Sequence, residues 1–167
     1  MRSGDVGVAP AFREVMAAVC TPVSVVTALD GDLPHGTTVS AFASLSMQPP
    51  MVLVSLARTS DLLHVIRRAG GFGVNVLCGR QSALARRFAR KGGTTKFVGV
   101  PWELYAGVPR LPGAGGFLGC RTADLVPGGD HVIVLGDVVA AEPGAGPPLT
   151  YHARAFGTHI SLDGAAG

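Results

Sequence analysis

The spacing of apolar side chains predicts strands over most of the chain and helices over only a few segments. Alternating or continuous apolar runs predict strands over 23–29, 37–45, 51–56, 72–77, 116–126 and 131–141. A spacing of three and four residues predicts an amphipathic helix from Pro10 that covers part of the core, through Phe12, Val15, Met16 and Val19. Two more helices are predicted, one behind Thr59 or Ser60 that ends at Gly70, and one over 81–90.

The stretch 36–56 organises the rest of the chain. Its first part, 37–45, alternates between apolar and mostly hydroxyl-bearing side chains, which predicts one strand with an apolar face and a hydroxyl face. Pro49 and Pro50 cannot donate to a sheet ladder, so we expect them to end this strand. The run 51–56 is apolar at all but one position, which predicts a strand buried on both faces. The hydroxyl face either meets solvent or lets a flat polar ligand lie close to the backbone.

Many strands with few intervening helices predict a mainly β barrel or sandwich with peripheral helices, not a parallel α/β sheet. Residues 127–130 predict a hairpin turn, and the Gly- and Pro-rich segment 92–115 predicts a long connection with one short strand. We expect one domain over 10–160, between a disordered lead (1–9) and a disordered tail (161–167).

Composition narrows the classes of partner. Of 167 residues 47% are apolar and only 15% are charged, so we expect part of the apolar surface to lie in a subunit interface. A net charge of +3 suits small anionic ligands better than nucleic acid. No apolar run approaches the roughly 20 residues that span a bilayer, and no signal-peptide core is present, so no membrane and a cytoplasmic location are expected. Cys20, Cys78 and Cys120 are odd in number and have apolar neighbours, which predicts buried free thiols without metal or disulfide.

Two motifs resemble those of the short-chain flavin reductases. The first has the form T-x-S-[SA]-F-x-S-x-S-x-x-P-P, matched here by Thr38, Ser40, Ala41, Phe42, Ser44, Ser46, Pro49 and Pro50. The second, G-D-H-x-[IV]-x-x-G-[DE]-V, is matched throughout from Gly129 to Val138. The resemblance implies a Greek-key, FMN-binding split β-barrel that forms a homodimer, with the flavin near the subunit interface. Ala41 stands where the family also has serine, which removes one hydroxyl contact.

The resemblance also implies roles for individual residues. The positions that match the flavin-ring contacts are Thr38, Val39, Ser40 and Ala41, with Ser44 and Ser46 further along the motif. His131 is implied to orient the nicotinamide as the catalytic residue, although a histidine at a strand start is often only a turn residue. Tyr151 and Arg154 resemble a C-terminal segment near the same pocket.

Candidates for phosphate binding come from two segments. Ser55, Arg58 and Ser60 follow the buried strand, and Ser60 lies near a helix N-terminus, where anions are favoured. Phe88 and Lys91, with Ser82 and Arg87, match a region that resembles the family's ribityl-phosphate and adenosine contacts. The alternative for the arginines of this helix is a solvated face.

The implied activity is that of an NAD(P)H:flavin oxidoreductase, which takes a hydride from NADH or NADPH and supplies reduced FAD or FMN to a partner monooxygenase. One alternative is a flavin-binding carrier or sensor without turnover. Another is a pyridoxamine phosphate oxidase of related fold, whose basic phosphate-binding pattern is not evident. Neither the choice of flavin nor the choice of nicotinamide follows from the sequence.

Overall fold

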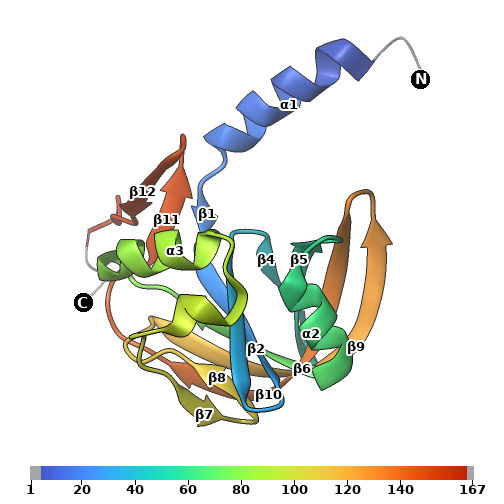
Figure 1. The fold of residues 1–167 in the computed structure, drawn as a ribbon. Helices are drawn as coiled ribbons and strands as arrows, with labels where there is room; N and C mark the ends of the chain where they lie inside the picture. Colours follow the sequence, from blue (N-terminus) through green and yellow to red (C-terminus); the bar gives the residue numbers. More distant parts are fainter. Residues whose placement is uncertain (1–4, 165–167) are drawn as a thin grey trace.

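A seven-stranded antiparallel sheet makes up most of the computed structural model, which describes residues 5–164 (Figure 1). Its strand order is β3-β2-β6-β9-β10-β5-β4. The strands are β2 (Ser24–Asp30), β3 (Leu33–Val39), β4 (Phe42–Met47), β5 (Pro50–Ala57), β6 (Gly71–Val76), β9 (Gly116–Gly128) and β10 (His131–Pro143). A three-stranded sheet is formed by β1 (Thr21–Pro22), β11 (Leu149–His152) and β12 (Ala155–Thr158), and a two-stranded one by β7 (Glu103–Tyr105) and β8 (Val108–Arg110).

The large sheet curls so that its two ends approach each other. β3 leads almost directly into β4 at the opposite end of the strand order, and the Ser55 N–H of β5 donates to the Ala41 carbonyl at 2.9 Å. Val39 of β3 and Val54 of β5 belong to one buried cluster. The helices lie outside this barrel, so the predicted mainly β class with peripheral helices is confirmed (Figure 1).

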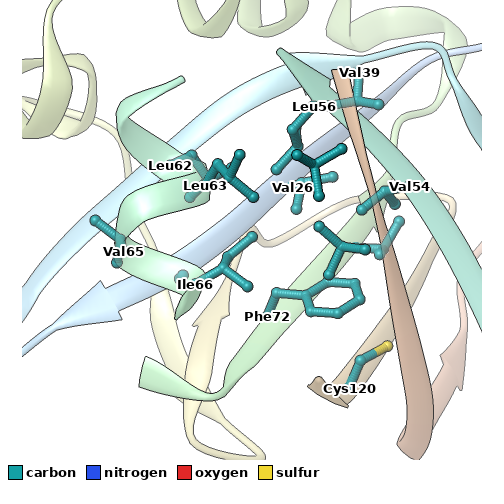
Figure 2. Packing of buried hydrophobic residues seen from close by; sticks show 14 of the residues in the cluster. Val26, Val39, Val54, Leu56, Leu62, Leu63, Val65, Ile66, Phe72 and Cys120 are labelled. Atoms are coloured by element: carbon teal, nitrogen blue, oxygen red, sulfur yellow. The ribbon is translucent and has the colours of Figure 1, made fainter. Parts of the chain in front are cut away.

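Helix α2 (Asp61–Ala69) covers the larger part of the core. Its buried side chains are Leu62, Leu63, Val65 and Ile66, as the apolar spacing predicts. Figure 2 shows Leu63 and Ile66 pointing from α2 towards Val26 and Phe72 of the sheet. The helix follows Ser60 and ends at Gly70, which takes the left-handed conformation (φ 70°) typical of a C-cap.

A second core cluster lies under α3 (Ser82–Ala89) and the 3-10 turn η2 (Gly93–Phe97); another 3-10 turn, η1 (Gly79–Gln81), leads into α3. Phe88 and Phe97 meet edge to face, with ring centroids 4.8 Å apart. The hydroxyl of Thr38 donates to the Ala85 carbonyl at 2.6 Å, so β3 holds α3 directly.

Helix α1 (Asp5–Ala18) does not cover the core, and this prediction is wrong. It projects away from the body of the chain (Figure 1), and the side chains of Phe12 and Val15 are 61% and 63% exposed. Its last turn is tied to the β11–β12 turn, because the Ala153 N–H donates to the Ala17 carbonyl at 2.8 Å. It begins at Asp5, so 5–9 are helical where a disordered lead was expected; 1–4 and 165–167 lie outside the described residues.

The stretch 36–56 differs from the prediction in two ways. The strand predicted over 37–45 is broken at Ser40, where β3 ends and β4 begins after Ala41. Strand β5 is fully buried on one face only, through Val52, Val54 and Leu56, and its other face is half-buried in the single chain. The proline pair does end the strand, since β4 and β5 pair up to Met47 and Pro50.

Three further expectations are settled by the structure. The hairpin predicted at 127–130 is present, with His131 paired to Gly128. The connection 92–115 holds two short paired strands and η2 instead of one short strand. Cys78 and Cys120 are buried free thiols as predicted, whereas Cys20, which lies between α1 and β1, is exposed. No helix within 5–164 combines the length and apolarity needed to cross a membrane.

Candidate active site

A cavity of about 300 Å³ opens where β3, β5 and the start of β10 meet, and we call it the first cavity. Seven of the sequence-predicted site residues line it, namely Thr38, Val39, Ser40, Ala41, Ser55, Ser60 and His131. Residues that are more than 70 positions apart in the chain therefore face one space. This convergence is what the two separate motifs predicted.

The break between β3 and β4 forms one wall of the first cavity. The carbonyls of Ser40 and Ala41 are used, since they accept from the Phe42 N–H at 3.1 Å and the Ser55 N–H at 2.9 Å. The N–H groups of Ser40 and Ala41 have no hydrogen-bond partner among the described residues. Unpaired backbone donors beside a cavity are available to a ligand's acceptors. Phe42 turns away from this wall and packs against the core.

The hydroxyl groups of this wall divide into two kinds. Those of Thr37 and Thr38 donate to carbonyls of α3, at 3.4 Å to Phe88 and 2.6 Å to Ala85, so they hold the helix. The hydroxyls of Ser40, Ser55 and Ser60 make no hydrogen bond within the described part of the chain. The serines, not the threonines, can therefore donate to a ligand in the first cavity.

His131 is positioned by its neighbour Asp130 and by the edge of β5. Its Nδ1 lies 2.7 Å from a carboxylate oxygen of Asp130, and its backbone pairs with Ala57. The hydrogen bond with His131 is the main reason why the pKa of Asp130 is lowered, so the carboxylate is ionised at neutral pH and can only accept. The Nδ1 side of the ring is therefore engaged by Asp130, and Nε2 has no hydrogen-bond partner among the described residues.

Arg58 holds the turn that carries this pair. Its Nε donates to the Gly129 carbonyl at 2.7 Å, and its backbone N–H donates to the Asp130 carbonyl at 2.9 Å. Arg58 does not line the first cavity. In the structure Arg58 fastens β5 to the β9–β10 turn, and its phosphate contact stays a prediction.

A second cavity of about 360 Å³ continues from the first, with which it shares Thr37, Ala57 and Ser60. The predicted Lys91 lines it, together with Lys96. The ammonium of Lys96 donates to the carbonyls of Gly36 and Phe88, both at 3.1 Å. Burial lowers the pKa of Lys96, and the nearby carboxylate of Asp61 opposes this effect. The cations and the N-terminus of α2 make this cavity suitable for a phosphate group.

A third cavity of about 480 Å³ lies on the other side of the first and shares Thr38 and Ser40 with it. The predicted Tyr151 lines this cavity, with its ring 5.2 Å from that of Phe156. Two arginines, Arg86 and Arg90, lie in the same wall. Through these shared residues the three cavities adjoin one another along β3, and we refer to them together as the groove.

Some predicted residues lie elsewhere. Phe88 is fully buried in the cluster under α3 and offers no surface to a ligand. Arg154 is paired with Glu14 of α1 at 2.7 Å. Ser44 and Ser46 lie on β4 beyond the break, and neither lines the first cavity. These four were expected at the site because they match segments of the family that contact its ligands.

Sequence reasoning missed Thr37, Ala57 and Lys96, which line the first or second cavity. Lys96 lies in the segment expected to be irregular, where no pattern indicated a role for it. Ala57 has no chemical signal in the sequence, because it contributes shape alone.

The groove fits a flavin nucleotide by the chemistry of its donors. Unpaired N–H groups and serine hydroxyls line the first cavity, where the acceptors of a flat heterocycle would lie, and cations line the second, where its phosphate would follow. A group of three or more side chains able to hold a metal ion is not found within residues 5–164.

Comparisons with known proteins identify the family of the chain. The model of the flavin reductase like domain family matches residues 16–159. The chain is 40% identical over 147 residues to the FMN reductase (NADH) SmoA of Agrobacterium fabrum, covering 87% of this chain and 83% of that protein. It is 40% identical over 149 residues to the reductase component of a 4-nitrophenol 4-monooxygenase from Rhodococcus opacus, covering 89% and 80%.

Among solved structures, the NADH:FAD oxidoreductase SgcE6 of Streptomyces globisporus in complex with NAD and FAD fragments superposes with a TM-score of 0.86. The two chains are 30% identical, and the match covers 98% of this chain and 99% of that one.

Proposed function

Because the chain belongs to the flavin reductase like family, we propose that it is an NAD(P)H:flavin oxidoreductase that reduces FMN or FAD with a hydride from a nicotinamide nucleotide. The observation that carries this proposal is the first cavity, in which the serines and free N–H groups at the β3–β4 break face His131. The same split-barrel fold in a reductase of known cofactors supports it.

The chain's own residues supply binding and orientation. The N–H groups of Ser40 and Ala41 and the hydroxyl of Ser55 would hold the polar edge of the flavin ring, and Ser60 and Lys91 its phosphate. Donors fixed in this way favour the extra negative charge of a reduced ring. When bound, the flavin supplies the hydride acceptor and carries the reducing equivalents to the next reaction.

His131 would orient the nicotinamide. With Nδ1 engaged by Asp130, its Nε2 can accept a hydrogen bond from the carboxamide N–H of the nicotinamide. The reaction requires the two rings at roughly 3 to 3.5 Å, so positioning matters more than proton transfer. Arg58 acts on the nicotinamide only indirectly. It is a positioning residue, because it holds the turn on which Asp130 and His131 lie.

The test is to mix the purified protein with NADH or NADPH and to follow the absorbance of the reduced nicotinamide with and without added FMN or FAD. Flavin-dependent loss of this absorbance is expected. Flavin binding without any loss would instead support the carrier or sensor hypothesis and overturn the reductase proposal.

We also propose that the protein works as a homodimer in the cytoplasm and passes reduced flavin to a separate monooxygenase. The exposed apolar side chains of α1, such as Phe12 and Val15, and Met47 on β4 support an interface between copies. Relatives named as monooxygenase reductase components support the partner. Sedimentation of the protein alone, and hydroxylation assays with a candidate partner, test the two parts separately.

A further inference from the structure

The turn between β11 and β12 has an unusual backbone for its sequence. His152 pairs with Ala155, so Ala153 and Arg154 form a two-residue loop, and their φ angles are 48° and 63°. Positive φ at both positions is typical of a type I′ turn, which favours asparagine followed by glycine and is unfavourable for residues that carry a Cβ atom. The turn is therefore strained, and contacts outside the hairpin must hold it.

Other hairpins of the chain avoid this strain. The turns that join β2 to β3, β7 to β8 and β9 to β10 place a glycine at a positive φ, through Gly31, Gly107 and Gly129. Glycine adopts such angles without a steric cost. The β11–β12 turn has no glycine, so turn preference does not account for its shape.

Helix α1 provides contacts that hold this turn. The Ala153 N–H donates to the Ala17 carbonyl at 2.8 Å, and the Arg154 guanidinium pairs with the Glu14 carboxylate at 2.7 Å. Both contacts are made with the last two turns of α1, and Figure 1 shows the tip of the hairpin beside this part of the helix. Each central residue of the strained turn is thus fastened to α1.

The strands next to the turn carry the aromatic wall of the third cavity. Tyr151 and Phe156 lie opposite each other, one position beyond the residue pair that flanks the turn, and both line that cavity. Their rings meet edge to face, with centroids 5.2 Å apart. Neither residue lines the first or the second cavity. A shift of the turn would therefore move a wall of the third cavity and leave the walls of the other two in place.

We propose that α1 holds the β11–β12 turn in its strained form and thereby positions the Tyr151–Phe156 wall for the nicotinamide donor. Glu14 and Arg154 then act as positioning residues that do not touch the donor. The inference rests on the proposed reductase function, in which the flavin occupies the first and second cavities and the third is left to the donor. When the turn is released, only the fraction of molecules with the wall in place binds the donor, so the apparent affinity falls in proportion.

The experiment measures kcat and KM of full-length variants with NADH at saturating FMN, and with FMN at saturating NADH. Glu14→Arg places two like charges at the contact and should raise KM for NADH about two- to fivefold, with kcat and KM for FMN little changed. Glu14→Arg combined with Arg154→Glu restores an ion pair and should return KM for NADH to within about 1.5-fold of its original value. Asp32→Arg makes the same change of charge in the exposed β2–β3 turn and is the matched control, with no effect on KM expected.

A relaxed turn separates positioning from any other role of α1. Ala153→Asn introduces a residue that this turn type prefers, so the hairpin depends less on α1. Adding Glu14→Arg to this variant should change KM for NADH by less than about twofold. The proposal is overturned if Glu14→Arg leaves KM for NADH unchanged, or if its effect is the same in the Ala153→Asn background. Failure of the exchanged ion pair to restore KM would place Arg154 in the donor site itself and would also overturn it.

The proposed function can fail without deciding this question. If the unmodified protein consumes no NADH with any flavin, hydrogen exchange of the amides in β11 and β12 still tests the contact with α1. Exchange at Tyr151 and Phe156 should be faster in Glu14→Arg than in Asp32→Arg, and should slow again when the ion pair is exchanged. Equal exchange in the two single variants would overturn the proposal.

Discussion

Gly136 of β10 is a motif residue whose role follows from packing. A methyl group at this position would lie 2.5 Å from Cζ and 2.9 Å from Cε1 of Phe72, and 3.0 Å from Cβ of Cys120. Phe72 is fully buried at the centre of the main core (Figure 2), so its ring has no free space to move into. We therefore predict that Gly136→Ala destabilises the protein, although alanine is normally better than glycine in a strand.

The two effects can be compared in magnitude. Overpacking of a core typically costs about 1–3 kcal/mol. Relief of the conformational entropy of glycine returns about 0.5–1 kcal/mol. The expected net loss in the free energy of unfolding is about 1–2 kcal/mol, which corresponds to a fall in Tm of roughly 2–8 °C for a chain of this size.

Thermal and urea unfolding of the apo protein would measure this loss. Gly128→Ala is the matched control in the same hairpin, because nothing lies within 4 Å of its added methyl group, and its stability should change by less than about 0.5 kcal/mol. Shortening Phe72 to leucine in the Gly136→Ala background should cost less than it does alone, since the space is shared. Equal stability of the two glycine variants would refute the packing argument.

Three other predictions concern the site and the thiols. His131→Ala should lower turnover with NADH at least tenfold while flavin affinity stays within about twofold, because the imidazole faces the donor; an equal loss of flavin affinity in fluorescence titrations would place His131 in the flavin site. The same variant should raise the pKa of Asp130 towards its ordinary value, because the hydrogen bond with His131 is the main reason why that pKa is lowered. The Asp130 carboxylate should then be protonated at a higher pH during acid titration. An unchanged pKa of Asp130 in NMR titrations would contradict the inferred contact. Iodoacetamide should label Cys20 alone in the folded protein, because Cys78 is buried and burial raises the pKa of Cys120 to about 12; mass spectrometry that finds labelled Cys120 in the folded protein would contradict this.

The elements predicted correctly from the sequence are those that depend on contacts between residues close together in the chain. The β9–β10 hairpin and α2 follow from turn residues and from a helical stripe that the chain itself covers. The break at Ser40 was not predictable by alternation, because it is set by the closing of the barrel between β3 and β5. The face of α1 was misassigned for a related reason, since periodicity reveals an apolar stripe but not what covers it.

For the site as well, the predictions succeeded where local sequence determines the structure and failed where distant contacts do. Residues at the cavity wall were identified where a motif fixes the backbone, as at Ser40 and His131. Arg58 and Phe88 lie outside the cavity walls because both contact distant segments, the β9–β10 turn in one case and η2 in the other. Side-chain type alone does not distinguish a cation that binds phosphate from one that holds a turn.

The hydrogen bond from Thr38 to the Ala85 carbonyl makes β3 and α3 one mechanical unit. Thr38 and Ser40 border both the first and the third cavity, so these two cavities share a wall. A ligand that moves this wall from one side changes the affinity of the other side, and the factor of that change must be the same in reverse. The Thr38 hydroxyl therefore joins the two cavities as well as the two elements.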